Sequence, residues 1–302
     1  AAPPRGERSA ALLGMALGVA FLVCFVTGIV SHLVQDPPSW FTWPARPAGL
    51  YRINQGLHVT TGLACIPLLV AKLWVVHPKL FERIEVRPVA HLVERAALLP
   101  LVGGATFLLL SGLGNVNIVR PYPFGFRDGH LAAAWITMGA LVVHVAARWA
   151  QTRPHLSIRS SPADGATGVG APDRPVVPEG ALDRRGFLAA VAGTSGLVAL
   201  LTVGQTVEPL RALAVLAPRR PDIGPQGFPV NRTAASVGLT DVDLTTYRLV
   251  VDGPGAATPL ELTYDDLLAL PQHEAELPIA CVEGWSTSQR WRGVRVRDLV
   301  AA

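Results

Sequence analysis

Six histidines lie within or beside long apolar stretches, where ionisable side chains are costly and by default mark a functional site. His130 and His144 are separated by 14 positions in one such stretch. On a helix this separation is close to four turns, so both imidazoles project from one face, about 21 Å apart along the axis. Imidazole is the commonest metal ligand among side chains. The spacing therefore predicts two metal centres at different depths of one helix.

The stretch that contains His130 and His144 resembles the two-histidine helix of b-type membrane cytochromes, which carry one haem near each membrane surface. The resemblance implies two haems b, each held six-coordinate between two imidazoles for electron transfer. The second ligand of each haem must come from a neighbouring helix at matching depth. For the haem at His130 we predict His58, which lies one turn inside its own stretch, with His32 as the alternative.

For the haem at His144 we predict His91 as the second ligand, with His77 as the alternative. His91 opens an apolar stretch just after Pro88, whereas His77 lies at the mouth of a loop beside Pro78. Histidines at helix ends are also common as plain interfacial residues. That simpler interpretation applies most to the two alternative ligands and least to His144, which lies well inside its stretch.

Cys281 is the other residue whose position suits metal chemistry, because it ends the strand-like run AELPIAC. A thiolate at the end of a strand is held rigidly toward a pocket and is a strong ligand for a high-valent metal. Cys24 and Cys65 lie inside apolar stretches, so the three cysteines form neither a disulfide framework nor a zinc site with paired cysteines.

The segment 278–300, PIACVEGWSTSQRWRGVRVRDLV, resembles the molybdenum-ligand segment of the sulfite oxidase superfamily. It is most similar to the branch that contains the molybdopterin subunit of bacterial methionine sulfoxide reductase. In that family a strand ends at a molybdenum-binding cysteine, and the loop that follows ends in Trp-x-Gly before the next helix. Here these residues are Cys281, Trp291 and Gly293. The resemblance implies Mo-molybdopterin as a cofactor, with Cys281 as the catalytic metal ligand.

The same resemblance implies further cofactor-binding residues around the cysteine. Asn231 occupies the place of a family asparagine that reaches the pterin, although Asn231 to Thr233 also matches a glycosylation sequon, which we discount. Arg290 is either a fork donor to the pterin phosphate or a solvated loop arginine. The complete set of cofactor-binding residues that the resemblance implies is Asn231, Glu283, Trp285, Ser286 and Arg290.

Five apolar stretches must position these residues. They run roughly over 11–34, 54–76, 91–113, 129–150 and 187–207, and each is long enough to span a bilayer as a helix. The composition agrees, because 50% of the 302 residues are hydrophobic and only 16% are charged. We therefore expect a membrane all-α bundle of about five transmembrane helices, followed by a partial α+β molybdopterin domain of the sulfite oxidase type.

The arginines and lysines between the five stretches predict the orientation, since cytoplasmic loops carry the excess of cations. With the N-terminus inside, the inner loops hold eleven cations and the outer loops hold only four, Arg46, Arg52, Arg120 and Arg127. The N-terminus is therefore expected in the cytoplasm and the C-terminal domain outside the cell membrane. Cations that are clustered between apolar stretches act as topology determinants, and they exclude a nucleic-acid-binding protein.

The fifth stretch opens with LDRRGFLAAVAG, in which Arg184 and Arg185 precede Phe187 and a run of small apolar residues. This pattern resembles a twin-arginine export signal, which directs a pathway for folded, cofactor-loaded domains. The simpler alternative is that the two arginines anchor the cytoplasmic end of an ordinary helix. We see no cleavage site and expect the stretch to remain as a fifth helix.

The chain after residue 207 alternates short strand-like and helical segments. YRLVVDG predicts a strand, LTYDDLLALP a short helix whose capping box is Thr263 with Asp266, and AELPIACVEGW another strand. The domains are expected at 1–155 (four-helix cytochrome b-like), 156–186 (cytoplasmic linker), 187–207 (anchor helix) and 208–302 (molybdopterin domain). The chain ends about 20 residues after Cys281, so we expect this last domain to be incomplete.

These features together predict a membrane-bound, molybdopterin-dependent oxidoreductase. Electrons would pass between haems in the membrane and an external molybdenum centre that transfers an oxo group, as a sulfoxide reductase or a sulfite oxidase does. The expected partners are membrane lipid, quinone or another electron carrier, and a small oxo-transfer substrate. Two alternatives remain: a membrane-anchored reductase without haem, and a non-catalytic membrane binding or assembly protein.

Overall fold

The computed structural model describes residues 4–80, 89–117, 119, 121–156, 182–216, 225–227, 230, 234–235, 238–239, 241–253 and 259–300. The chain divides into two compact units. The first unit contains the long helices and also the five residues Cys281–Trp285. The second unit contains the strands and the short helices of the C-terminal part.

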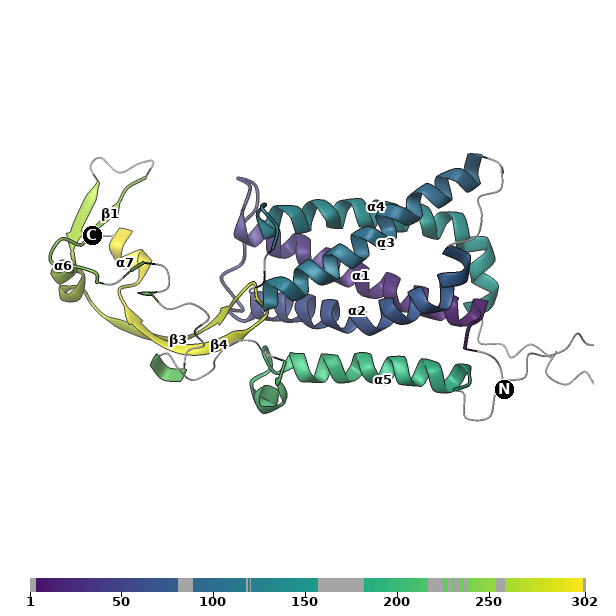
Figure 1. Ribbon diagram of the computed structural model, residues 1–302. Coiled ribbons are helices and arrows are strands. Elements are labelled where there is room, and N and C mark those ends of the chain that lie inside the picture. The colour runs from purple at the N-terminus through teal and green to yellow at the C-terminus, as the bar shows by residue number, and fades with distance from the viewer. Residues whose placement is uncertain are drawn as a thin grey trace, which may run out of the picture. The chain divides into compact units, whose positions relative to one another are not determined.

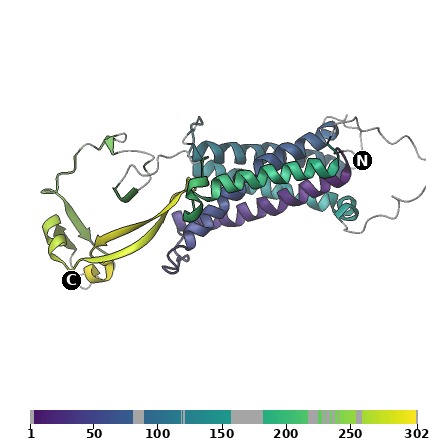
Figure 2. The ribbon, with the colours of Figure 1, turned by 90° about the horizontal axis from the view of Figure 1, so that it is seen from below.

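The first unit is built from five helices. They are α1 (Glu7–Gln35), α2 (Leu50–Leu80), α3 (Val89–Val116), α4 (Phe126–Leu156) and α5 (Arg184–Val203). They lie side by side, with α5 along the bundle (Figures 1 and 2). Each contains a span long and apolar enough to cross a membrane. The predicted positions of the five helices are therefore confirmed.

The surface of the bundle is apolar along the helices. Large hydrophobic side chains such as Val70, Leu99, Leu110 and Val142 have exposed fractions of 63%, 81%, 64% and 63%. A soluble protein rarely exposes so much contiguous apolar surface, whereas lipid tails solvate it without cost. Helices that are hydrophobic all round are typical of membrane spans.

Two apolar clusters hold the helices together. In one, Leu13 of α1 packs with Ala71 and Val75 of α2, and Phe187 and Val191 of α5 pack against them. In the other, residues of α2 and α3 pack with one residue of α5: Val59, Leu63, Val116 and Val198. Contacts with both clusters attach α5 to the bundle along much of its length.

The fifth helix begins three residues earlier than the sequence predicts and ends four residues sooner. Asp183 caps its N-terminus, because the carboxylate accepts a hydrogen bond of 2.8 Å from the backbone N–H of Gly186. Arg184 and Arg185 therefore lie in the first turn of α5 rather than before it. After Val203 the chain turns at Gly204 and continues as η2 (Glu208–Leu213).

The second unit contains two antiparallel hairpins and short helices. β1 (Arg248–Val251) pairs with β2 (Leu260–Thr263), and β3 (His273–Ala280) pairs with β4 (Ser286–Gly293). α6 (Tyr264–Ala269) follows β2, α7 (Val296–Val300) follows β4, and η3 (Pro225–Gly227) precedes the strands. The predicted strand, short helix and strand are confirmed, and so is the capping box of Thr263 and Asp266.

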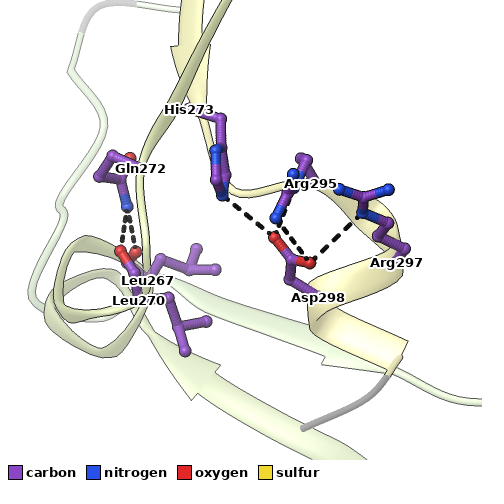
Figure 3. Close-up of polar contacts among 7 residues, drawn as sticks. All are labelled: Leu267, Leu270, Gln272, His273, Arg295, Arg297 and Asp298. Atoms are coloured by element: carbon purple, nitrogen blue, oxygen red, sulfur yellow. Dashed lines mark hydrogen bonds and ion pairs between the residues drawn. The ribbon is translucent and has the colours of Figure 1, made fainter.

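Polar contacts join the start of β3 to α7 (Figure 3). Arg295 Nε donates to Asp298 Oδ2 over 2.7 Å, and His273 Nε2 lies 3.3 Å from the same oxygen. Gln272 Nε2 donates to the carbonyls of Leu267 and Leu270 and so closes the end of α6. The hydrogen bond from Arg295 holds the pKa of the Asp298 carboxyl below its usual range.

Candidate functional site

His58 of α2 and His130 of α4 face each other inside the helical unit. Their ring centres are 6.3 Å apart and the ring planes are inclined by 69°. An imidazole nitrogen lies about 2 Å from a bound metal and about 1.2 Å from its own ring centre. Two imidazoles on opposite sides of one iron therefore have ring centres about 6 Å apart. The observed separation fits an iron held between the two rings.

The hydrogen bonds of His58 define which nitrogen can bind a metal. Its Nδ1 lies 2.9 Å from the backbone carbonyl oxygen of Cys24 and 3.1 Å from Thr27 Oγ1. A carbonyl only accepts, so Nδ1 carries the proton and donates it. Thr27 Oγ1 itself donates to the carbonyl of Val23, so it too can accept from Nδ1. This arrangement leaves the lone pair on Nε2 as the metal ligand.

The surroundings of His130 repeat this pattern. Its Nδ1 lies 3.0 Å from Ser111 Oγ of α3. Ser111 Oγ donates to the carbonyl of Leu108 over 3.3 Å, which leaves its lone pairs to accept the Nδ1 proton. Phe126 flanks the ring, with ring centres 5.0 Å apart. When Ser111 accepts the Nδ1 proton, Nε2 of His130 keeps its lone pair.

The two histidines line a cavity of about 220 Å³ between α1, α2, α3 and α4. Gly28 and Gly112 lie beside the imidazoles: a Cβ atom at Gly28 would be 3.1 Å from His58 Cε1, and one at Gly112 would be 3.8 Å from His130 Cε1. A side chain at Gly28 would crowd the ring. The two imidazoles and the adjoining glycines thus line the same cavity.

The other predicted haem ligands do not form a second facing pair among the described side chains. His144 is half-buried on α4, and His91 belongs to α3, but the His91 side chain lies outside the described residues. Their pairing stays a prediction. His77 is exposed near the end of α2. His32 lines the same cavity as His58, and its buried Nδ1 has no hydrogen-bond partner among the described residues.

Cys281 immediately follows β3, as the sequence predicts for a strand-end ligand. The cysteine is half-buried and is not part of a disulfide. Its N–H donates to the carbonyl of Trp285 over 2.9 Å, and its own carbonyl accepts from Gly284 N–H over 3.0 Å. Gly284 has φ +92°, a conformation that other residues rarely adopt. These bonds close Cys281–Trp285 into a tight turn, called here the Cys281 loop.

Only some of the remaining predicted cofactor-binding residues lie in the Cys281 loop. Glu283 and Trp285 lie in it, and Trp285 is 7% exposed. The expectation that Ser286 and Arg290 lie in a loop is wrong, because both belong to β4, whose residues pair with β3 from Ser286 to Gly293. Asn231 lies outside the described residues.

Arg290 is exposed, and its backbone is bound by a neighbouring glutamine. Gln226 of η3 accepts from Arg290 N–H over 3.2 Å and donates to its carbonyl over 2.9 Å.

Thr287 and Gln289 of the same strand are buried and hydrogen-bonded to each other. Sequence reasoning missed these two residues, although their alternation with less buried positions in a strand is a usable signal.

Sequence reasoning also missed the polar residues near His58 and His130. Thr27, Ser31, Asn54, Gln55 and Ser111 are polar positions in otherwise apolar helices. That contrast is the signal that could have found them, because intramembrane polar groups bond to one another or to functional side chains. Among the described residues no cluster of three or more His, Cys, Asp or Glu could hold a metal ion.

Residues 236–302 match the sequence model of a family described as oxidoreductase molybdopterin binding domain. The match includes Cys281 and all four strands, and it agrees with the resemblance of the segment 278–300. It supports a molybdenum-dependent oxidoreductase with molybdopterin as its cofactor. The searches of curated proteins and of solved structures found no match.

Proposed function

We propose that this chain is a membrane-bound molybdopterin oxidoreductase that exchanges electrons between haem b in the helical unit and an external molybdenum centre. The observation that carries the proposal is the strand-end cysteine, Cys281, inside the segment that matches the molybdopterin-binding family. When bound, the molybdenum centre would exchange an oxo group with a small substrate and the haems would carry single electrons.

The residues of the helical unit have defined tasks in this proposal. His58 and His130 would bind one iron through their Nε2 atoms, and the hydrogen bonds at Nδ1 fix the orientation of both rings. The spacing of His130 and His144 supports a second haem, with His91 as the proposed partner of His144. Quinone or a similar carrier in the lipid is the proposed electron partner.

The residues of the Cys281 loop would hold the metal and shape its surroundings. Cys281 would bind molybdenum as a thiolate, and Gly284 permits the turn that brings the chain back after it. Asn231, Glu283, Trp285, Ser286 and Arg290 remain proposed contacts of the cofactor.

The arrangement in the membrane is part of the same proposal. The five apolar helices support an odd number of crossings, so that the N-terminus and the C-terminal domain lie on opposite sides. The excess of cations in the loops on the N-terminal side favours a cytoplasmic N-terminus. A twin-arginine signal at the start of α5 would then export the folded molybdopterin domain.

Replacing Cys281 tests the molybdenum ligand. Cys281→Ser retains the size of the side chain but replaces a soft thiolate by a hydroxyl that stays protonated, so the molybdenum content of the purified protein is expected to fall by at least about tenfold. Cys24→Ser is the matched control and is expected to keep the molybdenum content of the parent protein. Equal molybdenum in Cys281→Ser and the parent would refute the assignment.

An absorption spectrum distinguishes this proposal from a membrane anchor without haem. The purified, reduced protein is expected to have the sharp α-band of bis-histidine haem. A protein that contains molybdenum but no such band would be the anchored reductase. A protein with neither cofactor would be the non-catalytic alternative.

A further inference from the structure

The Cys281 loop belongs to the same compact unit as the helices, and one buried glutamine connects the two. Gln55 of α2 is 5% exposed, and its Nε2 donates to the carbonyl of Val282 over 3.0 Å. Val282 is the residue next to Cys281, and it lines the cavity that contains His58 and His130. Gln55 is therefore bonded one residue away from the proposed molybdenum ligand.

The oxygen of the Gln55 amide is bonded to side chains that lie toward His58. Ser31 Oγ donates to Gln55 Oε1 over 2.5 Å, and Asn54 Nδ2 donates to Ser31 Oγ over 3.2 Å. Asn54 Nδ2 also lies 2.9 Å from the carbonyl of Thr27, whose hydroxyl lies 3.1 Å from His58 Nδ1. The hydrogen bonds thus lead from the Cys281 loop to the backbone of Thr27, and the side chain of the same residue contacts the proposed haem ligand.

Two further contacts hold the loop at this position. Thr206, which follows α5, donates from Oγ1 to the carbonyl of Gly284 over 3.4 Å. Gly284 also packs on α2 so closely that a Cβ atom there would be 2.7 Å from Val59 Cγ1. Of the hydrogen bonds between the Cys281 loop and the helices described above, only that of Gln55 leads on to His58.

We propose that Gln55 is a positioning residue, which holds the Cys281 loop and links it by hydrogen bonds to His58. The proposal deepens the proposed function, since it relies on that function for the roles of Cys281 and His58. Both ends of the amide are bonded, so the side chain is locked in one orientation and fixes the Val282 carbonyl relative to α1 and α2. A locked loop keeps the two redox ligands at a constant separation, as electron transfer requires.

Gln55→Met in the purified membrane protein tests this role. Methionine has a similar volume but cannot bond to Ser31 or Val282. Hydrogen–deuterium exchange at the backbone amides of Cys281 and Gly284 is expected to become about threefold to tenfold faster, the change that loss of one buried hydrogen bond produces. The rate at which an added sulfoxide oxidises the haem, or added sulfite reduces it, is expected to fall about tenfold, with haem and molybdenum contents unchanged.

Asn117→Leu is the matched control, because Asn117 is an exposed amide just after α3 and is not among the residues that line the cavity. It is expected to change neither measurement. If Gln55→Met does not fold, Gln55→Asn replaces it, since an amide that is one methylene shorter cannot reach both partners. Correct folding is judged by unchanged cofactor contents.

The exchange measurement separates this inference from the proposed function, because it needs no cofactor. Unchanged exchange of the Cys281 loop in Gln55→Met overturns the positioning role whether or not the protein carries haem. Faster hydrogen–deuterium exchange of the Cys281 loop, with an unchanged rate of haem oxidation or reduction by the substrate, overturns the link to His58. Absence of haem from the parent protein refutes the proposed function, and the exchange result then decides the role of Gln55 alone.

Discussion

At the scale of single residues, the arrangement around His58 and His130 specifies how the rings could bind a metal. Each Nδ1 is directed to an oxygen that is able to accept: the carbonyl of Cys24 for His58, and the hydroxyl of Ser111 for His130. Since a neutral imidazole has one donor and one acceptor nitrogen, both rings keep a lone pair on Nε2.

Replacing His130 tests the first haem site. His130→Ala removes one of the two proposed axial ligands of one iron, so the ratio of haem to protein is expected to fall by half when both haems are counted. The ratio is measured from the haem absorbance of the purified protein after extraction of the pigment. The expected loss is confined to one haem, because His144 would bind the other.

His155→Ala is the control for this experiment, since His155 lies at the end of α4, where it pairs with Glu7, and is not a predicted haem ligand. It is expected to leave the haem content unchanged. An unchanged ratio in His130→Ala, or an equal loss in both variants, would contradict the pairing of His58 with His130.

At the scale of elements, α7 is attached to β3 mainly through Asp298. This carboxylate is bonded to Arg295 and lies near His273 and Arg297 (Figure 3). Its side chain is about one quarter exposed, so water and salt weaken these ion pairs only in part. The contacts fix the end of the β3–β4 hairpin that is opposite to Cys281.

The contacts of Asp298 predict how the stability of the C-terminal unit depends on pH. The pKa of Asp298 is lower in the folded state than in the unfolded chain, chiefly because Arg295 donates to the carboxylate. The ionised carboxylate therefore stabilises the fold above the unfolded pKa of about 4, and this contribution is lost as the pH falls through the lower, folded pKa. Asp298→Asn is expected to lower the melting temperature at pH 7 and to weaken the loss of stability in acid.

The measurement is thermal unfolding of the purified protein between about pH 7 and pH 3. Asp241→Asn removes another exposed carboxylate of the same unit and serves as the control, with an expected melting temperature equal to that of the parent. If Asp298→Asn and the parent lose stability in parallel over the whole pH range, the ion pair is not the cause.

At the scale of the whole molecule, the start of α5 determines how the C-terminal domain would reach the other side of the membrane. Arg184 and Arg185 lie in the first helical turn, behind the N-cap Asp183, and a long apolar helix follows. An ordinary anchor needs only two positive charges at this position, whereas an export signal depends on the guanidinium groups themselves. The two interpretations therefore predict different effects when the two arginines are replaced by lysine.

Replacing both arginines by lysine distinguishes the two interpretations. The variant Arg184→Lys with Arg185→Lys keeps both charges, so a plain anchor would still insert and display the domain outside. If the pair is a twin-arginine signal, the C-terminal domain is expected to stay inside the cell, where protease added to intact cells cannot reach it. Arg148→Lys with Arg153→Lys is the control at the end of α4, and is expected to leave the domain accessible to protease.

The sequence alone determined the elements that depend on local patterns. Five apolar stretches of bilayer length predicted five helices, and the capping box of Thr263 and Asp266 predicted the start of α6, because hydropathy and capping act over a few neighbouring residues. The strand that ends at Cys281 followed from the same kind of pattern. The sequence was less accurate at the ends of α5, where the cap at Asp183 and the turn at Gly204 decide the boundaries.

Only the tertiary structure decided which distant residues meet. The hydrogen bonds that orient His58 and His130, the pairing of Ser286 and Arg290 with residues of β3, and the bond from Gln55 to Val282 each depend on how separate elements pack. Gln55 and Val282 are separated by 227 positions, and no local pattern specifies such a contact. Local propensity defines the helices and strands, whereas the orientation of an imidazole or an amide follows from the partners that packing brings within hydrogen-bonding distance.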